Sequence, residues 1–403
     1  MPAASLSRVP APVNAADRLH ALDVLRGLAL FGMILVHFHQ KVRLPATGVE
    51  ELIGWGVWVL VEQKAWGTFA FLFGVGFAIL LRRLEARGTP IRSIYLIYLR
   101  RLAALAFVGI VAEVGFGFHI LFEYACWGLA LLFVRRWSSR ALLAAAAVFA
   151  CARPLAAELI AVHAWLTSAS PAVPPTPSLV QAVDAAARQG AYVALLSARW
   201  ALFINSFPHS WRDVLPDVNL ALFTVGLLAV RHRVLDDPQR QIRLIAGWMT
   251  FGAVSWAASW LVLRRLPRMP IPGADWPLEY GLGLIQDQWL CFTYIGAIVL
   301  LLAYRPIWTA RLAIFGFAGR QALTNYMVQA AVLDALSSGY GAGLTLRPYA
   351  YTAAAVLLFG MEAVGSRAWL TKFRFGPLEW IWRMVTYASI QPVRRSVVET
   401  VSV

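Results

Sequence analysis

Charged residues are scarce in this sequence. They make up 14% of its 403 residues, whereas 60% are hydrophobic. A typical soluble domain has roughly 25% charged and about half apolar residues. A water-soluble protein of this composition lacks the polar side chains to cover its surface, so the excess apolar surface must face lipid. The shortage of charge therefore argues against a soluble domain and indicates an integral membrane protein.

Cysteine is rare as well, and the common catalytic motifs are missing. Cys126, Cys151 and Cys291 stand alone in apolar segments, without the spacing of a disulfide framework, so we interpret them as small hydrophobic side chains. The sequence contains no P-loop, no HExxH and no GxSxG motif. No cluster has metal-ligand spacing. These absences disfavour an ATPase, a zinc protease or a serine hydrolase, and we expect no bound metal.

What the sequence does contain is arginine, in short loops between apolar segments. The net charge of +15 would suggest nucleic acid for a soluble protein. Here no basic helix or aromatic RNA-binding strand accompanies it, and the clustering follows the positive-inside pattern of membrane proteins. Seventeen Trp and twelve Tyr suit the two membrane interfaces. We therefore expect the lipid bilayer, and no nucleic acid, as a partner.

The apolar segments predict the fold class: all-α, a polytopic bundle of about ten transmembrane helices. A helix needs about 20 apolar residues to cross the hydrocarbon core. The predicted spans are 22–39, 66–81, 101–116, 118–134, 141–163, 215–230, 244–263, 284–304, 313–336 and 347–366. Segments 50–63 and 192–207 are less apolar, and either can be an interfacial or re-entrant helix.

The domain organisation is simple. Residues 1–17 are Pro- and Ala-rich, and we predict a disordered tail. Residues 18–390 are predicted to form a single transmembrane domain and 391–403 a cytoplasmic tail. A signal peptide at 18–46 is disfavoured, because the apolar run is long and no A-x-A-like site follows. Connection 164–191 is predicted to be an extracytoplasmic loop, because Pro171, Pro174, Pro175 and Pro177 interrupt it.

The arginine-rich loops also predict the orientation. Arginines gather at 82–101, at 135–140 and at 231–243. With ten spans these segments fall on one side together with both termini, and the positive-inside rule makes that side cytoplasmic. Arg264, Arg265 and Arg268 fall on the other side and do not fit this pattern.

The first span carries ionisable residues. Arg26 and His37 are eleven residues apart and return to within about 20° of one direction on a helix. Asp23 precedes Arg26 by three residues and shares that face. Ionisable groups inside a membrane are costly and mark function by default. Asp23 and His37 are roughly 21 Å apart along the axis, so Asp23 is expected to pair with Arg26 or Arg18, and a neutral His37 to act as a general base.

A structural interpretation of the same residues stays open. Asp23 and Arg26 then form an ion pair without a chemical role, and His37 is an interfacial histidine.

Four motifs resemble the YeiB-like family of bacterial membrane proteins, a domain of unknown function. The first is R-x4-D-x2-RG-x-AL-x-GM, which begins at Arg18. The second is the run from Phe69 to Gly76. The other two motifs are the segments 319–329, GRQALTNYMVQ, and 375–387, FGPLEWIWRMVTY. The resemblance implies a multi-pass protein of the bacterial cytoplasmic (inner) membrane.

The first span is also similar to that of transmembrane acyltransferases, in particular the acyltransferase-3 group. The signature of that group is an Arg, ten residues and a His that is taken as catalytic, and Arg26 and His37 reproduce it. Many YeiB-like members have Asn at the position of His37. A second departure is His119, which stands where the family usually has Asp. The resemblance implies His37, Arg26 and Asp23 as catalytic candidates.

Further polar residues are candidates for substrate binding. A polar set in the ninth span either joins helices or lines a cavity. Glu379 and Arg383 are spaced for a helical ion pair, and Arg320 either ends a helix or meets a phosphate. His39, Glu62 and Glu113 are candidates to orient His37 or to protonate a leaving group. The substrate-binding candidates are Arg18, His39, Arg320, Asn325, Tyr326, Gln329, Glu379 and Arg383.

The sequence thus favours a membrane-embedded acyltransferase. It would move an acyl group from an acyl-CoA-like donor to a hydroxyl of a sugar, lipid or metabolite, without a permanently bound cofactor. A transporter or flippase for a small or lipidic molecule is the first alternative, and a non-catalytic membrane assembly protein is the second. A homodimer is compatible with the sequence.

Overall fold

The computed structural model describes residues 20–42, 44–167, 176–206, 215–263 and 275–395. These residues form helices, with one isolated antiparallel bridge between Phe373 and Arg394. The helices are α1 His20–His39, α2 Val49–Leu60, α3 Glu62–Ala86, α4 Ile91–Ile110 with the π-helical turn Val111–Gly115, α5 Leu121–Val134, α6 Ser139–Leu166, α7 Thr176–Gln189, α8 Tyr192–Ser206, α9 Val218–Arg231, α10 Ile242–Leu263, α11 Asp275–Tyr304, α12 Pro306–Arg311, α13 Ala313–Arg320, α14 Ala322–Ser337, α15 Pro348–Lys372 and α16 Pro377–Tyr387.

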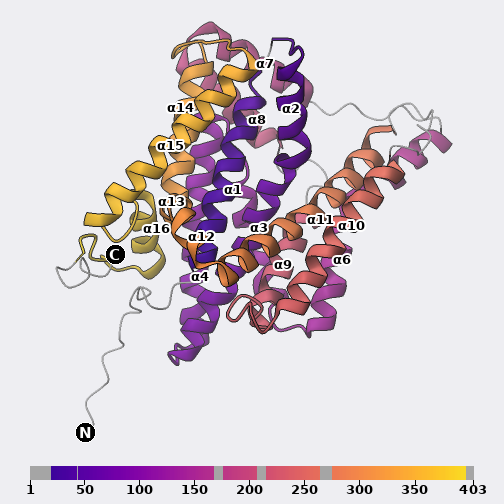
Figure 1. Cartoon of the computed structure of the whole chain (residues 1–403). Coiled ribbons are helices and arrows are strands. Elements are labelled where there is room, and N and C mark those ends of the chain that lie inside the picture. Colours follow the sequence, from indigo (N-terminus) through magenta and orange to yellow (C-terminus); the bar gives the residue numbers. More distant parts are fainter. Residues whose placement is uncertain (1–19, 43, 168–175, 207–214, 264–274, 396–403) are drawn as a thin grey trace.

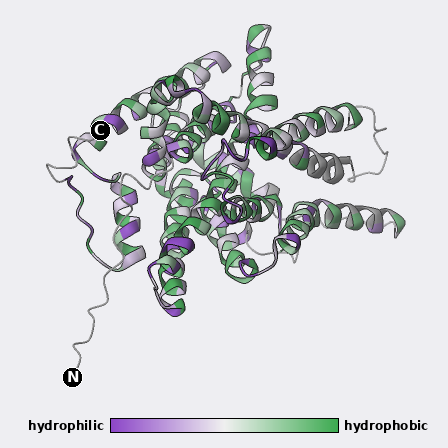
Figure 2. Cartoon of the chain, turned by 60° about the horizontal axis from the view of Figure 1, so that its bottom comes forward, coloured by the Kyte–Doolittle hydropathy of each residue, from purple (hydrophilic) through white to green (hydrophobic). Residues whose placement is uncertain are grey.

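Within the part of the chain that the structure describes, seven helical segments are long and apolar enough to cross a membrane, and three shorter apolar helices, α5, α8 and α9, accompany them. Hydrophobic residues run along the helices, and many hydrophilic residues lie at helix ends and in connections (Figure 2). The predicted all-α bundle is confirmed. The count of ten crossings stays a prediction, because it depends on whether the shorter helices also span the bilayer.

Helix α1 lies at the centre of the bundle, between α3, α13 and α15 (Figure 1). Its apolar window is 78% buried, whereas that of α10, at the edge, is 11% buried. Two glycines let α1 cross α13 at backbone distance. A Cβ atom on Gly27 would collide with the Phe315 carbonyl oxygen, and one on Gly319 with the Asp23 carbonyl oxygen. Close crossings through small residues are typical of membrane helices.

The structure corrects two predicted segments. The predicted span 313–336 is broken at Gln321, whose φ of −114° and ψ of 32° separate α13 from α14. The predicted loop 164–191 contains helix α7, which packs against α8. The prolines cluster before this helix, and Pro177 occupies its first turn, where a missing N–H costs nothing.

The arginine-rich segments meet at one end of the bundle, as predicted, and we call this end the arginine-rich end. Arg82 donates to Asp236 at 2.7 Å, and Arg135 donates to Glu85 at 3.1 Å. Arg231 donates to the carbonyl oxygen of Trp137 at 2.7 Å. Arg264, Arg265 and Arg268 lie outside the described residues, as do the predicted tail 1–17 and residues 396–403.

Candidate functional site

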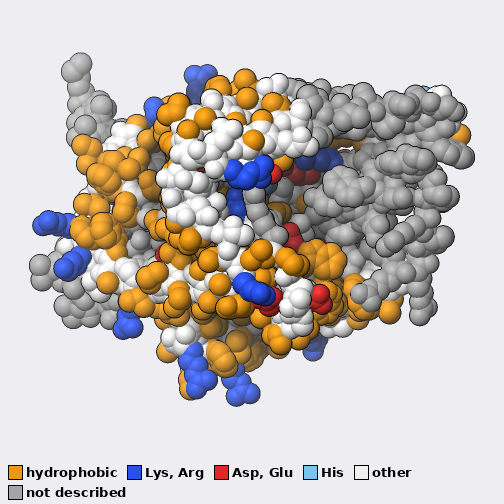
Figure 3. Space-filling model, turned by 90° about the horizontal axis from the view of Figure 1, so that it is seen from above, with side chains coloured by type: hydrophobic (Ala, Val, Ile, Leu, Met, Phe, Trp, Pro, Cys, Tyr) orange, Lys and Arg blue, Asp and Glu red, His pale blue; other side chains and the backbone are white. Residues whose placement is uncertain are grey.

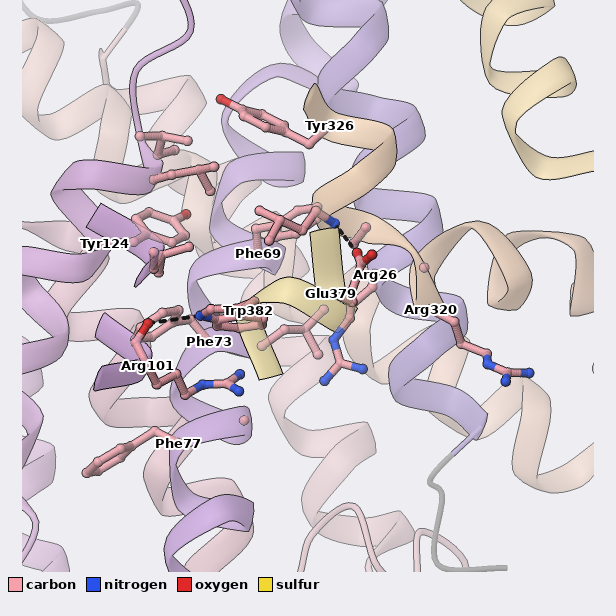
Figure 4. A pocket seen from close by; sticks show the side chains of 18 of the residues that line it. Arg26, Phe69, Phe73, Phe77, Arg101, Tyr124, Arg320, Tyr326, Glu379 and Trp382 are labelled. Atoms are coloured by element: carbon pink, nitrogen blue, oxygen red, sulfur yellow. Dashed lines mark hydrogen bonds between the residues drawn. The ribbon is translucent and has the colours of Figure 1, made fainter. Parts of the chain in front are cut away.

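A cavity of about 240 Å³ opens beside α1 at the arginine-rich end, and we call it the arginine cavity. Helices α1, α3, α4, α5, α13, α14 and α16 supply its walls. Its polar lining residues include Asp23, Arg26, Arg101, Arg320, Glu379 and Arg383. Figure 4 shows Arg101 and Phe77 toward one end of the cavity and Tyr326 toward the other.

Guanidinium groups from four helices dominate the charge of this cavity. Arg26 pairs with Asp23 at 2.7 Å, as predicted. Arg101 stacks on the ring of Trp382, with 3.8 Å between Cζ and the ring centroid, and Trp382 Nε1 donates to the Arg101 carbonyl oxygen at 2.9 Å. Arg26 and Arg383 are electrostatic neighbours of Arg101. Among the described residues no carboxylate pairs with Arg101, so the cavity can compensate the charge of an anion.

Arg320 lines the same cavity from the end of α13. Its guanidinium points away from Arg26 and Arg101 in Figure 4. A phosphate held by all three arginines at once therefore does not fit this arrangement.

Glu379 caps the half-helix α14. Its Oε1 accepts hydrogen bonds from the backbone N–H of Leu323 at 2.7 Å and of Thr324 at 3.1 Å, and its Oε2 accepts from Thr324 Oγ1 at 2.6 Å. Burial raises the pKa of this carboxyl, and the hydrogen bonds from Thr324 and the backbone oppose that shift. The first N–H groups of a helix lack partners within it, and a carboxylate there also complements the helix dipole.

The cap joins the two C-terminal motifs. Thr324 Oγ1 in turn accepts from the Leu378 N–H at 3.1 Å, at the start of α16. A Cβ atom on Gly376 would collide with the Glu379 carboxylate. Each motif thus supplies a hydrogen-bond acceptor for backbone N–H groups in the first turn of the other motif's helix. Spacing within one helix favoured a Glu379–Arg383 pair, and no local signal reveals a partner 55 residues away.

His37 lies further along α1, toward the end opposite the arginine-rich one. It is 7% exposed, and its Nδ1 lies 3.3 Å from Gln40 Oε1. Gln40 also hydrogen-bonds the Glu62 carboxylate. A carboxylate only accepts, so the Gln40 amide N–H₂ faces Glu62 and its oxygen faces His37. His37 Nδ1 must then carry the proton.

This arrangement leaves His37 Nε2 as the basic atom. Nε2 is buried and has no hydrogen-bond partner among the described residues. A buried nitrogen with an available lone pair, held in one tautomer by its other nitrogen, is what a general base requires.

The lining of the arginine cavity does not include His37, but it includes Met33 of the same helix and Tyr326. Phe118 lies beyond them, with ring-centroid distances of 5.7 Å to Tyr326 and 4.2 Å to His37. Phe118 therefore separates the base from the cavity, and a reacting group from that side must displace this ring.

A second cavity, of about 400 Å³, lies at the opposite end of α1. We call it the glutamate cavity, after Glu50, Glu51 and Glu62 in its lining. Gln40 and Val36 line it too. Seen from this end, acidic side chains are exposed near the centre of the face (Figure 3). His37 thus lies between two cavities whose lining charges are opposite.

The remaining predicted site residues are distributed more widely. Asn325 Nδ2 donates to Ser366 Oγ at 3.0 Å and Gln329 Nε2 donates to Glu362 Oε2 at 2.6 Å, and both contacts join α14 to α15. Tyr326 lines the arginine cavity.

Two further predicted residues contribute nothing to the arginine cavity. His39 Nε2 contacts Thr352 Oγ1 at 2.8 Å, and His39 lines the glutamate cavity. Arg18 lies outside the described residues.

Sequence reasoning missed Arg101, Trp382 and Gln40. Arg101 belongs to the arginine run at 82–101, which predicts the orientation and offers loop arginines for a phosphate without distinguishing Arg101 from the others. Gln40 lies three residues after His37, one helical turn away, and this spacing could have indicated it.

Comparisons with known proteins agree with the predicted resemblance. Residues 229–389 match the family described as "Protein of unknown function (DUF418)". Residues 18–179, which include Arg26, His37 and Arg101, match the catalytic domain described as "Heparan-alpha-glucosaminide N-acetyltransferase, catalytic". The N-terminal part of the chain is thus similar to a membrane acyltransferase domain. No solved structure gives a significant match.

Bacterial relatives match along most of the chain. The chain is 28% identical to "Uncharacterized protein YxaH" of Bacillus subtilis, over 95% of this chain and 98% of that protein. It is 24% identical to "Uncharacterized 39.9 kDa protein in amylase 3'region" of Bacillus acidopullulyticus, over 95% and 97%. It is 25% identical to "Uncharacterized protein YeiB" of Escherichia coli, over 37% and 45%. The resemblance to the YeiB-like family, predicted from four motifs, is confirmed.

Proposed function

We propose that this chain is a membrane-embedded acyltransferase that moves an acyl group from an acyl-CoA-like donor to a hydroxyl of a sugar, lipid or metabolite. The observation that carries this proposal is the position of His37. Its Nδ1 contacts Gln40 Oε1, which leaves Nε2 without a proton and without a hydrogen-bond partner among the described residues. His37 lies between an arginine-lined cavity and a glutamate-lined cavity.

The donor would enter the arginine cavity. Arg26, Arg101 and Arg383 would hold its phosphates, because guanidinium groups bind phosphate through paired, charge-assisted hydrogen bonds. The positive-inside pattern supports a cytoplasmic arginine-rich end in a bacterial inner membrane. The thioester would pass Phe118 to reach His37.

The chemistry needs one base and balances without a cofactor. His37 Nε2 takes the proton of the acceptor hydroxyl as its oxygen attacks the thioester carbonyl carbon. The C–S bond breaks, and the departing thiolate receives the proton from His37 Nε2–H. The match to an N-acetyltransferase catalytic model, which spans both Arg26 and His37, supports this reaction class.

The experiment gives purified protein labelled acetyl-CoA with lipid and glycan acceptors. The His37→Ala variant should lose about 10²–10⁴-fold in transfer rate, as expected for removal of a general base. His232→Ala is the matched control, because His232 contacts Ser139 Oγ at 3.0 Å and lines neither cavity, and it should transfer at close to the wild-type rate. Equal transfer rates for wild type and His37→Ala would contradict a catalytic role for His37.

Transport of a small or lipidic molecule is the second candidate, since two cavities on opposite sides of His37 and Phe118 also suit alternating access. Saturable uptake into proteoliposomes without covalent change in the solute would favour it. A non-catalytic assembly role predicts instead that alanine is tolerated at both Arg26 and His37.

A further inference from the structure

A third cavity, of about 490 Å³, lies between α3, α6, α9, α10 and α11, and we call it the apolar cavity (Figure 1). Among the described residues, none lines both this cavity and the arginine or glutamate cavity. Helix α3 separates it from the arginine cavity, since Phe71 lines the apolar cavity whereas Leu72 and Phe73 line the arginine cavity. The apolar cavity is therefore distinct from the site assigned to transfer.

Close helix packing surrounds this cavity, so loose packing does not account for it. Helices α3 and α9 cross at backbone distance, because a Cβ atom on Gly226 would collide with the Phe71 carbonyl oxygen. Helices α10 and α11 also cross closely, because a Cβ atom on Gly252 would collide with the Trp289 carbonyl oxygen. The space thus lies between two tightly packed helix pairs. Water does not fill an apolar cavity, and an empty one loses packing contacts, so an apolar occupant would stabilise the bundle.

The apolar cavity opens sideways between α6 and α10. Leu143 of α6 and Leu244 and Trp248 of α10 line it and are exposed. Along α11 the lining extends from Phe292 to Val299, about 10 Å at the rise of an α-helix. One leaflet of the hydrocarbon core is about 15 Å thick. The cavity is thus open to lipid and deep enough for the part of one acyl chain that lies next to the headgroup.

The rim of the apolar cavity is polar and lies at the arginine-rich end. Arg140, in the first turn of α6, and Gln241, directly before α10, stand on the two sides of the opening. Arg140 is exposed, and the described residues that line the cavity include no carboxylate. Arginines at the ends of membrane helices lie at the level of the lipid headgroups. The charge of the rim therefore complements an anionic headgroup above an apolar chain.

We propose that the apolar cavity binds an anionic membrane phospholipid, with one acyl chain between α6 and α10 and its phosphate at Arg140 and Gln241. A guanidinium group binds phosphate through charge-assisted hydrogen bonds, and the glutamine amide can donate another. A zwitterionic lipid brings a cationic group that finds no carboxylate in this lining. The bound chain would fill the space between the two helix pairs and stabilise their packing. This site does not depend on the proposed function.

Native mass spectrometry of the purified full-length protein tests the proposal. Delipidated protein in detergent is titrated with phosphatidylglycerol and, in parallel, with phosphatidylcholine of the same chains. We expect one retained phosphatidylglycerol per chain and about fivefold weaker binding of phosphatidylcholine, the contribution of one arginine near the headgroups. Equal affinities for the two lipids, or a retained fatty acid or detergent in place of any phospholipid, would overturn the proposal.

A charge variant tests the rim. Arg140→Gln should weaken phosphatidylglycerol binding about fivefold and leave phosphatidylcholine binding unchanged, so that the preference between the two lipids disappears. Arg136→Gln is the matched control, because Arg136 is exposed at the same end and does not line the cavity. It should keep the preference. Unaltered phosphatidylglycerol binding in Arg140→Gln would contradict the assignment of the phosphate.

A second variant tests the cavity itself. Ala229→Phe places a ring in the cavity from α9 and should weaken binding of both lipids by about tenfold or more, because the ring occupies the space of the acyl chain. Val254→Phe, on the exposed side of α10, is the control and should bind both lipids as wild type does. Wild-type lipid binding in Ala229→Phe would contradict the site.

The measured masses also test a second copy of this chain as the occupant. A wild-type dimer without phospholipid that Ala229→Phe converts to a monomer would assign the cavity to a contact between two copies, and the lipid proposal would be wrong. If Ala229→Phe does not fold, the comparison of Arg140→Gln with Arg136→Gln decides the proposal, because both side chains are exposed.

Discussion

The two cavities at the ends of α1 differ in charge and in construction. Part of the wall of the arginine cavity is formed by α14 and α16, which cap each other through Glu379 and Thr324. The glutamate cavity is bordered by the exposed helix α2, where Trp58 is 64% exposed. One helix thus borders two cavities, one walled by two helices that hydrogen-bond each other's first turns and one walled by an exposed helix. The difference teaches that two cavities on one helix can differ in how firmly their walls are fixed.

The largest effect is expected from breaking a buried ion pair that lies away from the arginine-rich end. Arg199 Nη2 donates to Asp334 Oδ1 at 2.5 Å, and Asp334 also accepts from Tyr340 and Ser338. Asp334→Asn should cost about 3–5 kcal/mol of unfolding free energy, because it leaves the Arg199 charge buried and unpaired. SDS titration of the purified protein measures this.

The control is Asp237→Asn, whose partner Arg240 is 88% exposed. It should cost less than about 0.5 kcal/mol. Equal losses of unfolding free energy in Asp334→Asn and Asp237→Asn would show that the Arg199–Asp334 pair does not stabilise its part of the bundle.

The next effect concerns the rigid wall itself. Glu379→Ala removes the cap of α14 and should cost about 2 kcal/mol in the same titration. Glu379→Gln keeps an acceptor for the Leu323 N–H and should lose less than half as much. A full-sized loss in Glu379→Gln would mean that the charge, and not the hydrogen-bond geometry, stabilises this wall.

A smaller effect is expected where the glutamate cavity meets the base. Gln40→Leu should lower kcat about tenfold with the KM of the donor unchanged, since only the orientation and tautomer of His37 are lost. Glu62→Gln retains an acceptor oxygen for the Gln40 amide and should keep most of kcat. ¹⁵N NMR of labelled histidine reports the tautomer directly, and a wild-type tautomer in Gln40→Leu would contradict the positioning role.

The smallest effect should be at the arginine cavity. Arg101→Gln should weaken CoA binding about fivefold, or about 1 kcal/mol, and reduce its salt dependence, because one half-buried guanidinium is lost. Titration calorimetry at two salt concentrations measures both. Arg92→Gln, an exposed arginine at the same end, is the control. Equal losses in the two variants would make the binding nonspecific attraction to a basic surface.

The sequence by itself determined the class of protein and the position of its central helix. Apolar runs of membrane-spanning length predict helices, because backbone groups in lipid must pair within their own segment. Spacing placed Arg26 and His37 on one helix face, because helical periodicity is a local property. The resemblance to transmembrane acyltransferases then made them catalytic candidates. The Asp23–Arg26 pair followed from the same periodicity and is present at 2.7 Å.

Only the tertiary structure decided what those residues face. The break at Gln321 was hidden because its cap, Glu379, is supplied from a distant segment. Arg101 became a cavity residue only because Trp382 of α16 holds it there, and the tautomer of His37 depends on Glu62 through Gln40. Helices can be predicted from the periodic spacing of residues in the sequence. Contacts between segments far apart in the chain produce no such periodic pattern.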